Sequence, residues 1–556
     1  MLMQRFYKDL GQIMEELQLR SKNAVFNESS VDAKALRYYN SCLKAPSQTW
    51  KMEHLLKLAP PGEGLSWPSF TIPGTEWPKD RFNWMDTLAI LHRYGVTDFL
   101  IKLEVSTNTI FGREPQLKLS IPSLEEDLDS KFYKSIPYTK LQLLESQVRN
   151  LIKWKADPME PYRYKSALSI EYITDLDWQK FIESIVGHRI SPEFPLLVNN
   201  FIYFAALKRL MDSTDPELLA NYFMFRFVNH LKKNTISGGT PGDCLWKLNH
   251  QMEMATNLLY KEHFQDSATL QKNIQEVHRI FNTMRRQLIL QINRNRMGLS
   301  SDQKAAVIEK VQGLVLNIGN IPRDLDHRSF VNGYYEDIEI SSEDLDYGRV
   351  QLELLWFRNR KLFDEVLEPS NTNLKINRRF RGPTSAYYIH AKNFIVIPFA
   401  LLQEPFFNAE SYDVFKYSLM GYVLGHELMH SIGTHGIYRD IHGKYLKIGD
   451  DILSLPQFKE GLSCMNRDKT EYLEERLADI EGAKLAYATY SSRNTKNLDK
   501  LFFRNMAQFF CEGGHSKNPA ISHDERPVRL RHILKNLDAF SKAFKCPSQH
   551  KKCNLW

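Results

Sequence analysis

One segment constrains the fold and the chemistry more than any other, the stretch Val414–Gly433, which reads VFKYSLMGYVLGHELMHSIG. Its apolar residues recur at three- and four-residue spacing, which predicts a helix, and Gly433 stands where a C-terminal cap is expected. His426 and His430 are four positions apart, so they project from one face of that helix. Two imidazoles at this spacing suit one zinc ion, and Glu427 lies where a metal-bound water would be. The plain alternative is a surface helix with two histidines and a salt-bridging glutamate.

A second helical segment supplies candidates for a third metal ligand, which a catalytic zinc site requires. The segment Lys469–Arg493 reads KTEYLEERLADIEGAKLAYATYSSR, and in it Glu475 and Asp479 are four apart on one face. We interpret Glu475 as the ligand and Asp479 as the acceptor of the free ring N–H of a ligand histidine. These carboxylates could equally form a solvated acidic face. Spacing alone also leaves three other candidate ligands: Glu471, Glu474 and Glu481.

The composition excludes several classes of protein. The chain has 556 residues, of which 43% are hydrophobic and 25% charged, as in a globular protein of roughly two or three domains. The net charge of +7 arises from interleaved basic and acidic residues, so we expect no nucleic-acid partner. No apolar run is long enough to span a bilayer, and Met1–Arg20 predicts an amphipathic helix, so we expect no transmembrane segment or signal peptide in this chain.

Helical patterns dominate the first two-thirds of the chain, and a short strand pattern follows them. A further helix is expected at Val350–Val366, and the polar loop Leu367–Pro383 is a plausible boundary between lobes. Ser385–Ile397 (SAYYIHAKNFIVI) predicts two short strands around a turn at Lys392–Asn393. The earlier helices are predicted at Asp32–Lys44, Glu145–Ala156, Asp175–His188, Glu217–Lys232, Leu245–Phe264 and Asp266–Met297.

Several segments have counterparts in a known family. VLGHELMHSIG and EERLADIEGAKLAY match its helices V-I-G-H-E-x-x-H-G-F and G-E-N-I-A-D-x-G-G. SAYY, IVIPFALLQEPFF, FFRNMAQFFC and the ending AFKCPSQHKKCNLW match further segments of that family. On these motifs the chain resembles the neprilysin and endothelin-converting-enzyme family of zinc metallopeptidases. The resemblance is dense from about Thr384 to Trp556 and is traceable back to about Asp32.

This resemblance implies a fold, a cofactor and an activity. The fold would be mainly α and two-lobed, with a helical lobe and a thermolysin-like α+β catalytic lobe. We expect a helical N-terminal lobe at residues 1–325, a connecting segment at 326–383 and the catalytic domain at 384–556. The implied activity is hydrolysis of short peptides by a water activated on one Zn²⁺ ion. The alternative is a catalytically weak or inactive zinc-binding relative that acts as a peptide-binding or signalling protein.

The resemblance also assigns roles to single residues. Glu475 falls on the family's third ligand, after the two histidines, and Glu427 on its general base. Asp479 falls on an aspartate behind the ligands that is often assigned as a proton donor. His523 falls on the histidine that hydrogen-bonds the oxyanion, and Arg529 on an arginine that supports substrate binding.

The substrate-binding strand departs from the family pattern. Ser385, Ala386 and Tyr387 fall on the family's N-A-Y/F-Y strand, but a serine replaces the asparagine that normally hydrogen-bonds the peptide backbone. A serine hydroxyl is shorter than an asparagine amide and has one oxygen, so we expect peptide binding there to differ. The spacing from His430 to Glu475 is also shorter than usual in the family.

The six cysteines leave the compartment open on composition alone, since none forms a C-x-x-C pair. Family members usually begin with a cytoplasmic tail, a membrane anchor and a cysteine-bearing segment, and this chain begins after them. We therefore expect an extracellular location or the lumen of the secretory pathway, and a cytoplasmic location if the short N-terminus is genuine. Either Cys511 pairs with Cys546, or the sequence belongs to a longer protein. The resemblance pairs the other four cysteines as Cys42 with Cys244 and Cys464 with Cys553.

Overall fold

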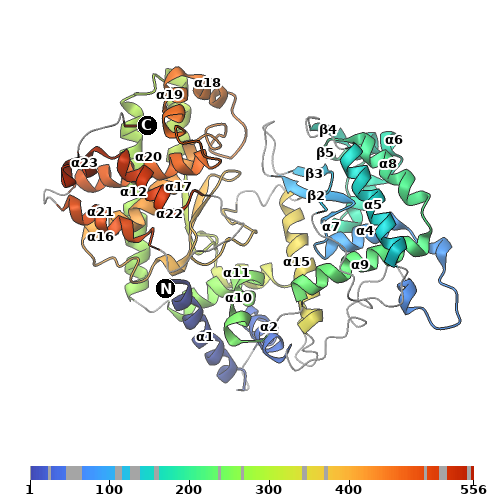
Figure 1. Cartoon of the computed structure of the whole chain (residues 1–556). Helices are drawn as coiled ribbons and strands as arrows, with labels where there is room; N and C mark the ends of the chain where they lie inside the picture. Colours follow the sequence, from blue (N-terminus) through green and yellow to red (C-terminus); the bar gives the residue numbers. More distant parts are fainter. Residues whose placement is uncertain are drawn as a thin grey trace.

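The computed structural model shows a mostly helical protein of two lobes joined through the long helix α15 (Tyr347–Leu367). Figure 1 shows one lobe at the right and a larger one at the left and bottom, which confirms the predicted mainly α, two-lobed architecture. The structure describes residues 2–22, 27–45, 65–106, 116–124, 138–155, 162–235, 239–264, 268–340, 347–367, 374–493, 498–511, 523–546 and 552–556.

The smaller lobe, here called the sheet lobe, is built around a five-stranded sheet with the strand order β1-β2-β3-β5-β4. Strands β3 and β5 pair in parallel and the other neighbours are antiparallel. The strands are β1 (Asp98–Phe99), β2 (Ile101–Ser106), β3 (Gln116–Ser120), β4 (Arg163–Ser166) and β5 (Pro195–Val198). The helices of this lobe are α4 (Trp84–Arg93), α5 (Tyr138–Lys155), α6 (Ala167–Thr174), α7 (Trp178–Val186), α8 (Phe201–Asp212) and α9 (Pro216–Thr235).

This sheet was not expected, because the sequence patterns in that region predicted only helices. In β2 the residues Ile101, Leu103 and Val105 are buried in alternation with half-buried neighbours, as a period of two requires. The strands are too short for that period to stand out beside the longer helical patterns. The helix predicted at Leu245–Phe264 is also two helices, broken at Met252, whose φ of −130° and ψ of 51° are not helical.

The larger lobe, here called the main lobe, combines the N-terminal helices with the C-terminal half of the chain. Its hydrophobic core runs from Phe6 in α1 to Trp556 at the C-terminus. Leu352 and Phe363 of α15 pack into the core of the sheet lobe, whereas Leu354 of the same helix packs into that of the main lobe. The core of the main lobe therefore draws on all three predicted segments, 1–325, 326–383 and 384–556. The N-terminal helices of the main lobe are α1 (Leu2–Arg20), α2 (Val31–Lys44), α10 (Pro241–Gln251), α11 (Glu253–His263), α12 (Ala268–Asn293), α13 (Ser301–Gln312) and α14 (His327–Tyr334).

A three-stranded sheet of the main lobe contains the two strands predicted around Lys392–Asn393. β7 (Tyr387–Ile389) and β8 (Phe394–Ile397) pair antiparallel, as predicted, and β6 (Val315–Ile318) adds a parallel strand to β8. The C-terminal part of the chain supplies further helices of the main lobe, which are labelled at the left of Figure 1. They are α16 (Asp413–Lys416), α17 (Tyr422–Ile432), α18 (Ile448–Ser454), α19 (Pro456–Met465), α20 (Leu473–Ser491), α21 (Asp499–Gln508), α22 (Arg526–Lys535) and α23 (Asp538–Phe544).

The helices α17 and α20 cross in direct backbone contact. A Cβ atom on Gly425 of α17 would lie 2.4 Å from the carbonyl oxygen of Gly482, and one on Gly482 would lie 2.5 Å from the backbone nitrogen of His426. No side chain fits into that space, so the crossing requires glycine on both helices. It brings the first turn of α20 beside the predicted metal-binding face of α17.

Gly433 stands at the predicted C-terminal cap of α17, but its backbone is not in the left-handed conformation. Its φ of −76° and ψ of −171° are extended and not left-handed, so the backbone there does not require glycine. A Cβ atom at this position would lie 2.3 Å from Oε1 of Glu474. Glycine at the end of α17 therefore leaves room for a carboxylate of α20.

Two disulfides join distant segments of the main lobe. Cys42 of α2 is bonded to Cys244 of α10, and Cys464 of α19 to Cys553 near the C-terminus, which confirms both predicted pairs. Cys511 and Cys546 are exposed and free, so they do not pair with each other. Disulfides form in oxidising compartments. Among the described residues, no helix is both long and apolar enough to cross a membrane.

The crossing of α17 and α20 predicts the effect of adding one methyl group. We expect Gly482→Ala to lower the free energy of unfolding by about 1–3 kcal/mol, because the new Cβ meets backbone that cannot move aside. Gly333→Ala in α14 is the matched control, since nothing lies within 4 Å of a Cβ there. That control should be neutral or stabilising by up to about 1 kcal/mol. Urea unfolding of both variants measures the difference, and equal stabilities would contradict the prediction.

Candidate metal centre

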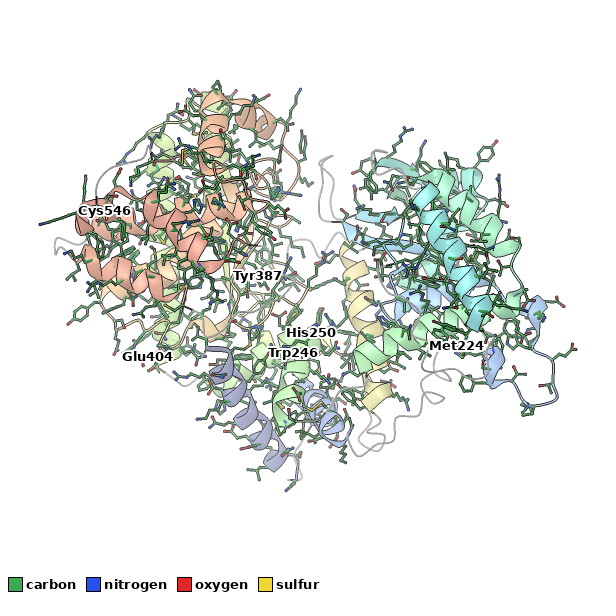
Figure 2. The ribbon with its side chains drawn as sticks, viewed as in Figure 1. Met224, Trp246, His250, Tyr387, Glu404 and Cys546 are labelled. Atoms are coloured by element: carbon green, nitrogen blue, oxygen red, sulfur yellow. A yellow bond between two sulfur atoms is a disulfide. The ribbon has the colours of Figure 1, made fainter. Side chains whose placement is uncertain are left out.

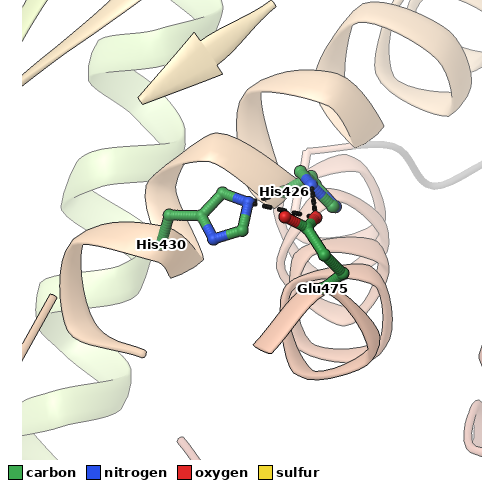
Figure 3. A group of neighbouring side chains, drawn as sticks. All are labelled: His426, His430 and Glu475. Atoms are coloured by element: carbon green, nitrogen blue, oxygen red, sulfur yellow. Dashed lines mark hydrogen bonds and ion pairs between the residues drawn. The ribbon is translucent and has the colours of Figure 1, made fainter. Parts of the chain in front are cut away.

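The three predicted metal ligands converge in space. Figure 3 shows the side chains of His426 and His430, from α17, turned toward that of Glu475, from the first turn of α20. Their ligand atoms all lie within 4.8 Å of one another. Oε2 of Glu475 is 3.1 Å from Nε2 of His426 and 3.4 Å from Nε2 of His430. The two imidazole Nε2 atoms are 3.1 Å apart.

This group of donors fits a zinc ion. Two imidazoles and one carboxylate, with a further position open, form the usual ligand set of a catalytic zinc. Burial by itself would raise the pKa of Glu475, but hydrogen bonds from His426, His430 and His523 hold it well below its usual range. The carboxylate is therefore ionised, as a metal ligand must be.

Asp479 lies behind His426 and is surrounded by donors. Its Oδ1 is 2.9 Å from Nδ1 of His426 and accepts a hydrogen bond of 2.7 Å from the hydroxyl of Tyr422. Arg529 donates to both of its oxygens, at 2.8 Å each. Burial would raise the pKa of Asp479, but the charge and hydrogen bonds of Arg529 and the hydrogen bond of His426 hold it well below its usual range. An aspartate so held is suited to orient His426, with Nε2 toward the ligand group.

Glu427 and three of the four predicted substrate-binding residues, Ser385, Ala386 and Arg529, border one cavity. Glu427 is buried, and burial raises the pKa of its carboxyl. The cavity has a volume of about 280 Å³ and is lined by Thr384, Ser385, Ala386, Leu401, Tyr422, Val423, His426, Glu427, Phe509, Phe510, His523, Arg526 and Arg529. The structure therefore brings almost every predicted site residue to one place.

Tyr387 is the predicted substrate contact that the structure places elsewhere. It follows Ser385 and Ala386 in the chain but does not line this cavity. Burial raises the pKa of its hydroxyl, and the nearby Glu253 carboxylate raises it further. Tyr387 thus lies toward the start of α11, in the region where Figure 2 labels Trp246 and His250.

His523 reaches the ligand group from a different part of the chain. Its Nε2 lies 2.8 Å from Oε2 of Glu475, and its ring stacks on that of His426 at 5.9 Å between centroids. The next residue, Asp524, accepts hydrogen bonds of 2.9 and 2.7 Å from Arg476 of α20 and one of 2.7 Å from Thr470. These contacts, here called the clamp of Asp524, were not predicted, because no local spacing relates residues so far apart in the sequence.

Glu474, one of the alternative ligands, lies on the other side of His430. Its Oε1 is 3.6 Å from Nδ1 of that imidazole, on the ring edge away from Glu475. Among the described residues, the ligand group therefore contains Glu475 and not its neighbour.

Comparisons with known proteins identify the relatives of this chain. Two models described as Peptidase family M13 match residues 141–322 and 385–554, which together are more than half of the chain. Neprilysin-11 of Caenorhabditis elegans is 23% identical over 657 residues, covering 98% of this chain and 74% of that protein. Endothelin-converting enzyme 1 of Mus musculus is 24% identical over 632 residues, covering 96% of this chain and 79% of that protein. For neprilysin of Oryctolagus cuniculus the identity is 23% over 498 residues, covering 76% of this chain and 64% of the relative.

Solved structures share the fold at lower identity. PepO from Lactobacillus rhamnosis HN001 superposes with a TM-score of 0.70 at 14% identity, covering 98% of this chain and 92% of that one. The zinc metalloprotease Zmp1 of Mycobacterium tuberculosis, in complex with an inhibitor, has a TM-score of 0.68 at 15% identity. The match covers 98% of this chain and 91% of that one. With both halves of the family's sequence pattern and its two-lobed fold present, the chain belongs to peptidase family M13.

Proposed function

We propose that the protein is a zinc-dependent metalloendopeptidase that hydrolyses short peptides. One observation carries the proposal: His426, His430 and Glu475 converge, and His426 lines a cavity together with the buried Glu427. Membership in peptidase family M13 supports the reaction class. The two disulfides support an extracellular or secretory-pathway location.

Each residue of the site has a distinct part in this proposal. His426, His430 and Glu475 would hold zinc, which when bound polarises a carbonyl and makes a water more acidic. Glu427 accepts a proton from that water at its carboxylate and passes it to the leaving amine. His523 donates a hydrogen bond to the oxyanion that develops on the oxygen of the scissile carbonyl. At comparable sites such a donor stabilises the transition state by about 2.7–4 kcal/mol. Asp479 and Arg529 keep the imidazole of His426 in place.

The cavity lining indicates how a peptide would bind. Val423, Phe509 and Phe510 give it an apolar wall, which suits an apolar side chain of the substrate. Ser385 would hydrogen-bond the peptide backbone with its hydroxyl. This serine, in place of the family's asparagine, is the observation that favours the second candidate function, a zinc-binding protein with weak or absent turnover.

The general base gives the first test of turnover. Glu427→Gln keeps the shape of the side chain but removes the proton acceptor, so we expect kcat to fall by roughly 100- to 10,000-fold. Zinc content should stay at one ion per chain, because Glu427 is not a ligand. Glu471→Gln, at an exposed position in the segment before α20, is the control and should cleave normally. Cleavage of a quenched oligopeptide and metal analysis measure both, and full activity of Glu427→Gln would overturn the mechanism.

Removal of the metal tests activity and stability together. We expect a zinc chelator to abolish the appearance of new peptide termini in mass spectra, and added zinc to restore it. Zinc that binds only the folded state should also raise the free energy of unfolding, by about 2.7 kcal/mol at a free concentration about 100 times the Kd. Zinc-dependent stabilisation without any cleavage would favour the second candidate function over the first.

Replacement at Ser385 tests how the substrate is held. We expect Ser385→Asn to raise kcat/KM by about 2- to 10-fold, because an amide reaches further and both donates to and accepts from a peptide backbone. Ser385→Ala is the matched comparison and should lower kcat/KM by losing the hydroxyl. Identical kinetics for all three proteins would show that position 385 does not contact the substrate.

A further inference from the structure

The imidazole of His430 faces a second carboxylate on the edge that points away from the ligand group. Its Nδ1 lies 3.6 Å from Oε1 of Glu474, and 10% of each side chain is exposed. Both atoms are buried, and in the described part of the chain neither has a hydrogen-bond partner within ordinary distance. A buried polar atom without a partner is costly, so a donor and an acceptor left over at such a short separation indicate a pair.

The loop after α17 holds the Glu474 carboxylate in place. Oε2 of Glu474 accepts a hydrogen bond of 2.7 Å from the backbone N–H of Thr434 and a second one from the hydroxyl of Thr434. Gly433, the residue before, leaves the space that Oε1 fills, since a Cβ there would lie 2.3 Å from that oxygen. Three separate features therefore aim Oε1 at His430: a backbone donor, a side-chain donor and a missing side chain.

The same arrangement exists once more in the site. Asp479, further along α20, faces Nδ1 of His426 at 2.9 Å. Both imidazoles thus present Nε2 to the ligand group and Nδ1 to a carboxylate of α20. A carboxylate in this position fixes the tautomer and the ring orientation of a metal-binding histidine and raises its basicity.

We propose that Glu474 is a positioning residue for His430. Its carboxylate accepts a hydrogen bond from Nδ1–H of His430 and so keeps Nε2 directed at the metal. The inference rests on the proposed zinc site and deepens it. It implies that a separate carboxylate of α20 supports each of the two histidine ligands. Zinc would then be held more tightly than if only one histidine had such a partner.

The test is the zinc affinity of Glu474→Gln in the full chain. Glutamine keeps an oxygen for Thr434 but turns an amide nitrogen, which donates and cannot accept a hydrogen bond, toward Nδ1 of His430. We expect the Kd for zinc, measured by competition with a chromophoric chelator, to rise by roughly 10- to 100-fold. Glu471→Gln removes the same charge at an exposed position and should leave the Kd unchanged.

Two further measurements separate positioning from a general loss of structure. The unfolding midpoint of metal-free Glu474→Gln should equal that of the metal-free parent, because the change acts on the metal-bound state. Thr434→Val, which removes the hydroxyl that holds Glu474, should weaken zinc binding by a smaller factor, and Thr434→Ser, which keeps it, should restore the parent Kd.

The outcomes distinguish this inference from the proposed function. A Kd for Glu474→Gln equal to that of the parent, or an equal rise in Glu471→Gln, overturns the role of Glu474 and leaves the zinc peptidase intact. A parent protein that binds no zinc overturns both.

Discussion

The contact between Gly425 and Gly482 is the constraint on which the site depends. The two helices approach until the carbonyl of Gly482 occupies the place of a side chain on α17. At this separation Glu475 reaches both imidazoles with one oxygen, and Asp479 reaches the far edge of His426. A wider crossing would separate the ligands that are now within 4.8 Å of one another. A close packing of backbones therefore determines the chemistry of the site.

That crossing also concentrates buried charge. Glu427 and Asp479 are buried with the two histidines in one small region, and only 10% of the Glu474 side chain is exposed. Burying carboxylates is costly unless each is paired or hydrogen-bonded, or stays neutral. Asp479 is compensated by Arg529 and Tyr422, and Glu474 by Thr434. For Glu427 burial instead raises the pKa, which suits a group that accepts and returns a proton.

The site is supported by segments from both ends of the chain. The core of the main lobe includes α1 and α2 together with the metal-site helices, and disulfides anchor α2 to α10 and α19 to the C-terminus. The helix α15 enters the cores of both lobes and so couples their positions. The lobe that carries the site is therefore not a continuous C-terminal domain, because the N-terminal helices complete its core.

The sequence by itself determined the helices that carry the ligands, the strand pair β7–β8, and the three residues His426, Glu427 and His430, because these follow from periodicity and spacing within single segments. The two disulfide pairs and the choice of Glu475 required the resemblance to a family. Only the tertiary structure decided which carboxylate faces which edge of each imidazole, because Glu474 and Glu475 are neighbours in sequence and the crossing angle and rotation of α20 separate their roles. It also decided the five-stranded sheet and the clamp of Asp524 by Arg476, since pairing between distant segments leaves no local period to read.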